Sequence, residues 1–432
     1  MTVLKSISNL ENSRLPTKRV EILMQNWSKN VDFNDRGYLQ PESLAELQEL
    51  VRSNAKLRAR GTAHCFNEIA NTSSFAINLS KMPKTIEINP ESNSVTVAAG
   101  LKYGELAPVL HEQGWALDNL ASLPHISIGG SISTGTHGSG VKNKNLANQV
   151  LSFDFVTAEG ELRHIDRANP AFSALVVGLG LGGIVYQYEL KIEPTFEIRQ
   201  VIYPDIPLDV LQRNFDGIMG TAYSVSYFTD WSSDQVGNLW CKFRDGEVIP
   251  ASIGGSNKAD KKYHPIPSVD AVACTDQLGE PGFWHERLSH FKLEFTPSVG
   301  EEIQTEFFVD RKDASAAIEA VSKLGSEITP LLWITELRTV AADDLWLSGA
   351  YQRDTLAIHF TWKKLDAIYP VIEKVEAALR PFNYRPHWGK VFTADVTYLK
   401  SVYPKMGEFQ ALVQALDPGK KFENSFTRKN VG

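Results

Sequence analysis

Cysteine is scarce in this sequence of 432 residues. Only Cys65, Cys241 and Cys274 occur, an odd number without the CxxC spacing that is typical of many zinc and redox sites. The sequence therefore predicts neither a disulfide framework nor a bound metal. Reduced thiols also favour a cytoplasmic location.

Long apolar runs and an excess of basic charge are missing as well. The first twenty residues contain no apolar run long enough for a signal peptide or a membrane-spanning helix, and we expect residues 1–25 to form a frayed or lightly docked extension. The net charge of -7 at pH 7 provides no general attraction for a phosphate backbone. Neither a membrane nor a nucleic acid is therefore an expected partner.

The remaining composition is that of an ordinary globular protein, with 43% hydrophobic and 22% charged residues. A chain of this length exceeds what one hydrophobic core usually organises, so we expect two large domains. The predicted units are residues 26–195, residues 196–405, and a C-terminal segment, 406–432, that packs back on the first domain. No heptad pattern indicates a coiled coil, and we expect a monomer.

Local patterns predict an α+β fold. Alternating β-branched and polar residues predict strands, and apolar residues at spacings of three and four predict helices. The strands are expected at 94–99, 150–156, 183–192, 222–229 and 291–295. A hairpin turn is expected directly after the strand at 150–156. The helices are expected at 101–114, 314–324 and 367–379, and a helix stop at 416–422 is expected to lead into an extended tail.

Three glycine-containing segments could approach a dinucleotide closely, since small residues let backbone N–H groups reach a pyrophosphate. They are residues 58–66, 127–138 and 178–183. The third matches GxGxxG, but a strand pattern follows it where a nicotinamide-binding Rossmann motif requires a helix. The second is too rich in glycine and hydroxyl side chains to be one regular helix over 129–138.

These segments carry a family resemblance. The sequences RGTAHCFNE at 60–68, ASLPHISIGG at 121–130 and TGTHG at 134–138 resemble the flavin-binding domain of the vanillyl-alcohol oxidase superfamily. From about Asn26 onward the chain resembles the alditol oxidase, or xylitol oxidase, family within it. The resemblance implies a two-domain flavoprotein, in which an α+β substrate (cap) domain with a mainly antiparallel sheet covers the FAD-binding domain.

The resemblance also implies a covalent cofactor. The histidine matching His64 is expected to bond the 8α carbon of FAD, although a lone histidine after a glycine turn is more often a surface or capping residue. Cys65 stands where serine is expected, but the loop at 120–124 lacks the cysteine of bicovalent relatives, so a single bond is favoured. The further residues expected to contact FAD are Ala59, Arg60, Gly61, Thr62, Ala63, Cys65, Ser122, Ser127, Gly130, Ser131, Ile132, Ser133, Thr134, His137, Ile184 and His387.

The second half offers polar residues on predicted strands. In a strand over 332–340, Glu336 and Arg338 project from the same face because side chains alternate. In a strand over 356–362, His359 and Thr361 share a face in the same way, and Lys390 follows a turn stiffened by proline. Taken singly, each is more often an ion pair, a core histidine or a surface charge.

The resemblance assigns roles to these residues. Ser122, Glu336, Arg338, Thr361 and Lys390 match positions that hold the polyol, and His359 and Lys390 lie where the reacting hydroxyl is handled. The implied reaction oxidises a terminal alditol hydroxyl, passes hydride to the flavin and then electrons to O2, and gives H2O2. Either His359 or Lys390 could take the proton, and Arg338 should keep Glu336 ionised.

Two alternatives remain open. A sugar-lactone oxidase or dehydrogenase shares the His-Trp-x-Lys pattern and a similar flavin half, although residues 283–291 and 294–298 look more like an alditol oxidase. A flavin-binding protein without turnover is the second alternative. The set Glu336, Arg338, His359 and Lys390 argues against it.

Overall fold

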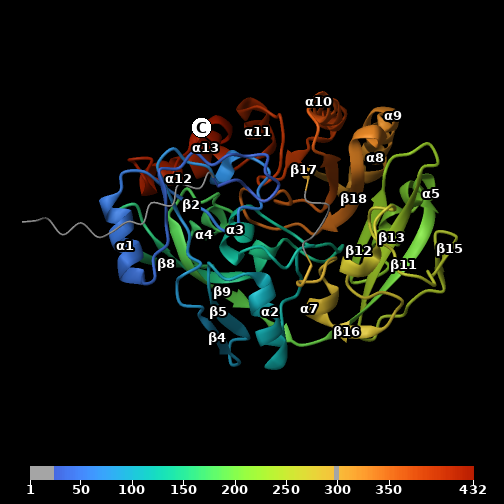
Figure 1. Ribbon diagram of the computed structural model, residues 1–432, viewed down its shortest axis with the longest axis horizontal. Helices are drawn as coiled ribbons and strands as arrows, with labels where there is room; N and C mark the ends of the chain where they lie inside the picture. Colours follow the sequence, from blue (N-terminus) through green and yellow to red (C-terminus); the bar gives the residue numbers. More distant parts are fainter. Residues whose placement is uncertain (1–23, 296–300) are drawn as a thin grey trace, which may run out of the picture.

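The computed structural model describes residues 24–295 and 301–432 (Figure 1). The extension expected over residues 1–25 therefore lies outside the described residues except for its last two positions, and so do residues 296–298 of the segment compared with alditol oxidases. Among the described residues, no helix is both long and apolar enough to cross a membrane.

Two sheets organise the first part of the chain. A small parallel sheet has the order β1-β3-β2, and a five-stranded antiparallel sheet has the order β4-β5-β9-β7-β8. The strands are β1 (Gly37–Leu39), β2 (Leu57–Ala59), β3 (Phe75–Ile77), β4 (Ile86–Asn89), β5 (Ser94–Ala98), β7 (Val150–Val156), β8 (Leu162–Asp166) and β9 (Ile184–Lys191). The helices here are α1 (Leu44–Ser53), α2 (Tyr103–Glu112), α3 (Ile128–Ser133) and α4 (Phe172–Leu175).

Several local predictions are confirmed in this part. The hairpin after residue 156 forms between β7 and β8, and β9 directly follows the GxGxxG-like segment, so the helix of a Rossmann motif is absent from that position. The glycine-rich segment 129–138 is helical only up to Ser133, where α3 ends. Its second half runs as an irregular stretch through Gly135, which has a positive φ of 69°.

An eight-stranded antiparallel sheet dominates the second part, with the order β16-β11-β13-β12-β18-β19-β17-β20. Its strands are β11 (Glu197–Pro207), β12 (Ser224–Thr229), β13 (Val236–Arg244), β16 (Pro281–Phe283), β17 (Glu302–Asp310), β18 (Leu332–Val340), β19 (Thr355–Lys363) and β20 (Arg385–Pro386). The chain passes from the five-stranded sheet to the eight-stranded sheet between β9 and β11. The exact domain boundaries stay a prediction.

The two faces of the large sheet differ in character. On one face, Leu337, Ile358 and Phe360 are buried in the main core, and helices α8 (Ala314–Ser322) and α10 (Ile368–Leu379) lie on the same side of the sheet in Figure 1. The other face carries alternating polar side chains toward the first part of the chain. Period-two alternation therefore gives this sheet one packed face and one functional face.

One strand prediction is wrong. Residues 291–295 form no strand: Phe291 makes a single isolated bridge with Cys274, and the chain then turns. Phe291 packs in a small apolar cluster, and the Leu293 carbonyl is satisfied by the His125 side chain at 2.8 Å instead of by a neighbouring strand. The run of apolar and polar residues was too short to distinguish these arrangements.

The predicted extended tail is also wrong. After α11 (Val396–Val402) and α12 (Met406–Leu416), residues Ser425–Asn430 form a further helix, α13. Asn424 and Thr427 make a capping box at its start, and the Asn424 amide donates to the carbonyls of Glu68, Ile69 and Asn71. Tertiary contacts thus stabilise a helix that is too short to be recognised from periodicity.

Candidate active site

A cavity of about 350 Å³ lies where the glycine-containing segments meet the polar face of the large sheet. All the expected cofactor and substrate residues line this cavity with a single exception, Ile132. Its side chain is fully buried in the main hydrophobic core, because α3 turns that position away from the cavity. The contact of Ile132 with the cofactor stays a prediction, which its buried side chain does not support.

The His64 loop has a constrained backbone. Ala63 has a φ of 57°, in the left-handed region that non-glycine residues rarely adopt. Surrounding segments hold this conformation: Trp27 N–H donates to the Ala63 carbonyl at 2.8 Å, and Phe66 N–H donates to the Gly389 carbonyl at 2.7 Å. Strained backbone of this kind persists when its surroundings fix it, and it occurs often at functional sites.

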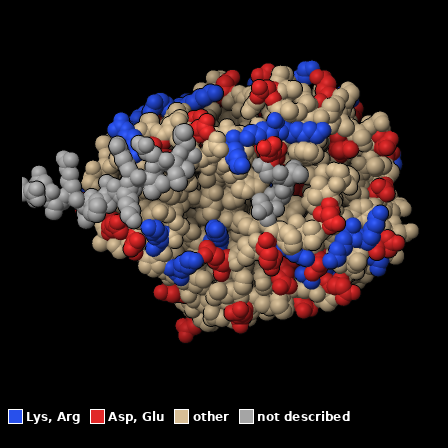
Figure 2. All heavy atoms as spheres, in the orientation of Figure 1, with Lys and Arg blue, Asp and Glu red and all other residues tan. Residues whose placement is uncertain are grey.

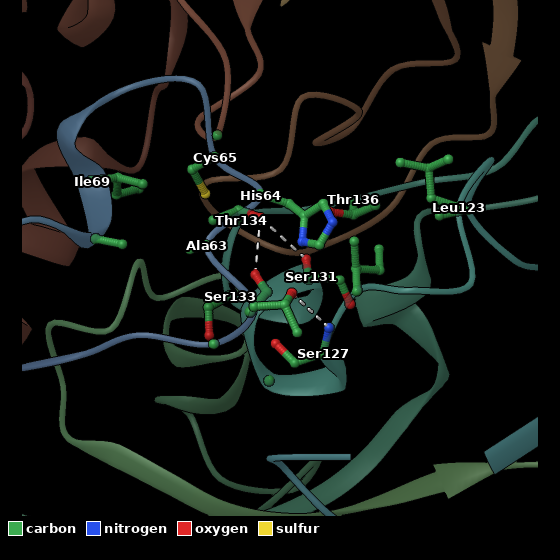
Figure 3. Close-up of a pocket in the computed structure, with 18 of the residues that line it drawn as sticks. Ala63, His64, Cys65, Ile69, Leu123, Ser127, Ser131, Ser133, Thr134 and Thr136 are labelled. Carbon is green, nitrogen blue, oxygen red and sulfur yellow. Dashed lines mark hydrogen bonds between the residues drawn. The ribbon is translucent and has the colours of Figure 1, made fainter. Parts of the chain in front are cut away.

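The His64 ring is positioned as an uncharged imidazole. Burial lowers its pKa to about 4, and its Nδ1 atom has no hydrogen-bond partner among the described residues. Trp27 stacks on the ring with centroids 5.8 Å apart. In Figure 3 the ring lies above Ser131 and Ser127 in the view.

The glycines at positions 61 and 130 let the cavity wall pack closely around Ser127. A Cβ atom added to Gly61 would lie 2.1 Å from Ser127 Oγ, and one added to Gly130 would lie 2.9 Å from the same atom. Ser127 N–H in turn bonds Thr62 Oγ1 at 3.2 Å. Narrow glycine-lined walls and an unpartnered buried imidazole fit a flat, extended dinucleotide such as FAD.

Three neighbouring strands present the polar face. In the strand register Glu336 of β18 lies opposite His359 of β19, which lies opposite Glu306 of β17. These three residues therefore form one row across the sheet, pointing into the cavity. Arg338 projects from the same face of β18, as its spacing from Glu336 predicts.

Glu306 is the centre of the ionic network. Its side chain is inaccessible to solvent, and its two oxygens bind Arg338 Nη2 at 2.6 Å and Lys390 Nζ at 2.7 Å. Burial alone would raise the pKa of Glu306, but Lys390, Arg338 and His137 hold it well below its ordinary value. One buried carboxylate thus fixes both cations of the site.

Glu336 is also ionised. Burial opposes this, but Arg338 and His290 hold the pKa of its carboxyl well below the ordinary range. The Arg338 Nε to Glu336 Oε2 distance is 3.6 Å, and His290 Nε2 lies 2.8 Å from Glu336 Oε1. The prediction that Arg338 keeps Glu336 ionised is confirmed, and the structure adds His290 as a second contributor.

His359 and Lys390 differ in how freely they can act. Burial, followed by the charge of Lys390, holds the pKa of His359 well below its ordinary value, and neither ring nitrogen has a hydrogen-bond partner among the described residues. Burial also lowers the pKa of Lys390, against the opposing charge of Glu306. His359 is therefore a free neutral base, whereas Lys390 is held by its counterion.

Sequence reasoning missed three buried side chains of the charged network, Glu306, His290 and Lys242. The alternation of Gln304, Glu306 and flanking apolar residues gave a signal for a third polar strand face, which could have identified Glu306. His290 and Lys242 gave no such signal, because each lies on an element whose proximity to Glu336 is created only by the tertiary fold.

The outer surface contrasts with this interior. On the face shown in Figure 2, lysine and arginine side chains are interspersed with aspartate and glutamate over most of the periphery. No single-sign field covers the described part of this face.

Comparisons with known proteins decide the family. The chain is 41% identical over 407 residues to an alditol oxidase of a Streptomyces species, covering 93% of this chain and 97% of that protein. The chain belongs to the alditol oxidase family. A family model described as an FAD binding domain matches residues 36–166, so the cofactor of this family member is FAD, and a model described as D-arabinono-1,4-lactone oxidase matches residues 299–430.

More distant relatives share the architecture. The mouse L-gulonolactone oxidase is 25% identical, covering 94% of this chain and 98% of that protein. Among solved structures, a solvent-stable cholesterol oxidase covers 94% of this chain and 97% of its own at a TM-score of 0.78 and 16% identity. The cholesterol oxidase of B. sterolicum gives a TM-score of 0.75 at 15% identity, with 94% and 96% coverage. The predicted two-domain flavoprotein fold is confirmed.

Proposed function

We propose that this protein oxidises the terminal hydroxyl of an alditol such as xylitol or sorbitol to the aldose, with FAD as the hydride acceptor and O2 as the final electron acceptor, giving H2O2. The observation that carries the proposal is that one cavity is lined both by the His64 loop and by the charged residues Glu306, Glu336 and Arg338. Alternating donors and acceptors suit a ligand with a hydroxyl on every carbon. The 41% identity to an alditol oxidase supports the same substrate class.

We further propose that FAD is attached covalently through His64. A neutral, buried imidazole with an unpartnered nitrogen is suited to forming a bond to the 8α carbon, and the strained Ala63 backbone orients it toward the cavity. Residues 59–63, Ser127, Gly130, Ser131, Ser133, Thr134, His137, Ile184 and His387 would surround the cofactor, because they line the same cavity. Cys65 lines it too, but burial raises the pKa of its thiol to about 11, which favours the inert protonated form.

FAD, when bound, supplies a two-electron acceptor for the hydride that leaves the alcohol carbon. The residues of the chain would handle the proton. His359 is neutral, so its ring can accept the proton of the reacting hydroxyl as the hydride departs. Glu336 Oε2 lies 3.9 Å from His359 Nδ1 and would stabilise the positive charge that then forms on the ring.

Arg338, Thr361, Ser122 and Lys390 would hold the polyol. Arg338 Nη1 lies 3.3 Å from Ser122 Oγ, so the arginine links β18 to the segment that carries Ser122. Ionised Glu336 can accept hydrogen bonds from hydroxyls, and the cations can donate to them. Lys390, fixed by Glu306, also places a positive charge where negative charge would develop during reduction.

A lactone oxidase is the second candidate, because the D-arabinono-1,4-lactone oxidase model matches residues 299–430, which include the polar strands. Peroxide release across a panel of alditols, aldoses and aldonolactones separates the two. The proposal predicts turnover of xylitol or sorbitol well above that of any lactone. Preference for a lactone would show that the substrate class is an aldonolactone. If a polyol bleaches the flavin under nitrogen but no peroxide forms in air, only the proposed electron acceptor, O2, would be wrong.

The same panel, run without oxygen, tests for a flavin-binding protein that does not turn over. Such a protein would keep its flavin oxidised in the presence of every polyol. The cytoplasmic location and the monomeric state stay predictions. The free thiols of Cys65, Cys241 and Cys274 are compatible with a reducing compartment.

A further inference from the structure

A chain of buried side chains leads from Glu336 through His290 to Lys242. His290 Nε2 lies 2.8 Å from Glu336 Oε1, and His290 Nδ1 lies 3.2 Å from Lys242 Nζ. Lys242 is on β13, two strands from Glu336 of β18, and is 1% exposed. None of the chemistry proposed above uses Lys242 or His290.

The three donors of the Lys242 ammonium are fully used. Besides His290 Nδ1, Lys242 Nζ bonds the carbonyls of Leu288 and Ser289, the latter at 3.1 Å. An ammonium has three hydrogens and no acceptor, so the three partners saturate it. Burial lowers the pKa of Lys242 to about 7, so the lysine is a saturated, fixed donor while it is protonated.

This arrangement selects one form of His290. Ionised Glu336 can only accept, so the proton of the neutral ring belongs on Nε2, and Nδ1 is then the acceptor that faces Lys242. Burial and the nearby lysine lower the pKa of His290 to about 4, so the ring is neutral. The edges of Phe228 and Trp240 against the ring, with centroids 5.5 and 5.6 Å away, keep it in this plane.

The two oxygens of the Glu336 carboxylate have different neighbours. Arg338 faces the other carboxylate oxygen at 3.6 Å, and His359 lies 3.9 Å from that same oxygen. His290 alone binds Oε1 among the described residues, so it sets the rotation of the carboxylate about its side-chain axis. The backbone of the segment is tied as well, since His290 N–H donates to the Ser122 carbonyl at 3.1 Å.

We propose that Lys242 and His290 are positioning residues that orient the Glu336 carboxylate, so that one oxygen is held by His290 and the other is presented to the hydroxyls of the polyol. The proposal rests on the function proposed above and names how that site acquires its specificity for polyhydroxylated substrates. Lys242 acts only through His290, and His290 only through Glu336.

The test compares His290→Leu with His290→Gln. The amide oxygen and nitrogen of glutamine have nearly the spacing of the two imidazole nitrogens, so glutamine can accept from Lys242 and donate to Glu336, while leucine can do neither. His290→Leu should raise the KM for xylitol about 10- to 100-fold, the loss typical of a hydrogen bond to a charged group. His290→Gln should restore it to within about threefold of the wild type. Lys242→Met should resemble His290→Leu, and Lys258→Met, an exposed lysine, is the matched control.

A second readout does not depend on turnover. Xylitol that binds the folded protein raises its melting temperature, and this shift should shrink in His290→Leu and return in His290→Gln. Ethane-1,2-diol lacks the inner hydroxyls that Glu336 would hold, so its KM should change far less than that of xylitol. A merely structural role would instead lower the flavin content or weaken both substrates equally, and either result would overturn the proposal.

A double-mutant cycle separates this inference from the proposed function. In a Glu336→Gln background, His290→Leu should add no more than about twofold, because its effect passes through the carboxylate. Equal effects in both backgrounds contradict the positioning role even if xylitol is the substrate. Failure of the wild type to be reduced by any polyol would refute the proposed function instead, whatever the variants do.

Discussion

Replacing Glu306 by glutamine removes the one charge that holds Arg338 and Lys390 together, and its cost follows from the structure. The carboxylate is fully buried and contacts both cations, at 2.6 and 2.7 Å. Removing one partner of a buried ion pair leaves uncompensated charge and costs about 3–5 kcal/mol. We expect Glu306→Gln to lose stability in that range at pH 7, and to reduce flavin slowly because Lys390 is no longer fixed.

The stabilisation by Glu306 should depend on pH in a defined direction. The folded-state pKa of Glu306 is well below its ordinary value of 4.5, so its contribution is present above pH 4.5 and is lost as the pH falls toward the folded-state pKa. Denaturant unfolding of the holoprotein at pH 7 and at pH 4 measures it: the gap between wild type and variant should be largest at pH 7. Glu319→Gln, at an exposed ion pair, is the control and should leave the midpoint nearly unchanged. A Glu306→Gln midpoint equal to wild type at pH 7 would refute the account of the network.

Three further predictions concern the flavin loop and the buried lysine. His64→Ala should leave no yellow colour on acid-precipitated protein, and colour that stays on the chain would exclude attachment at His64. Gly61→Ala should lower the flavin content of purified protein severalfold, since the added Cβ atom would lie 2.1 Å from Ser127 Oγ. A full complement of FAD in this variant would show that Ser127 can move to accommodate the methyl group. Burial lowers the pKa of Lys242 to about 7 from 10.5, so the unfolded state binds the extra proton between these values and stability rises with pH in that window. In denaturant titrations at pH 7 and pH 9, the free energy of unfolding should increase less with pH in Lys242→Met than in the wild type. An equal increase in both proteins would contradict the prediction.

The sequence predicted the polar faces well because they depend on a local rule. Glu336 and Arg338 on one strand and His359 and Thr361 on the next share a face through period-two alternation, and the structure places all four in the cavity. The strand after the GxGxxG-like segment was recognisable for the same reason. Segments whose conformation depends on distant contacts were not: 291–295 lacks a partner strand, and α13 requires the capping of Asn424 against Glu68, Ile69 and Asn71.

The charge network could be predicted only in part. Proximity in sequence indicated the Glu336–Arg338 pair, but the shorter contact of Arg338 is with Glu306, which precedes it by 32 residues and meets it only through strand pairing. His290 is 46 residues before Glu336 in the chain and lies in a loop. Contacts of this kind depend on register and loop placement, which composition and periodicity do not encode.

The most direct test of the central claim is anaerobic reduction of the flavin by xylitol in the wild type and in Lys390→Ala, followed by absorbance. If the charged strand face and FAD meet at the reacting carbon, the wild type bleaches, and the variant retains its flavin but bleaches at least about 100-fold more slowly, as expected for losing a charge that stabilises the transition state. Bleaching of Lys390→Ala at nearly the wild-type rate would show that the reaction occurs elsewhere, and it would contradict the account.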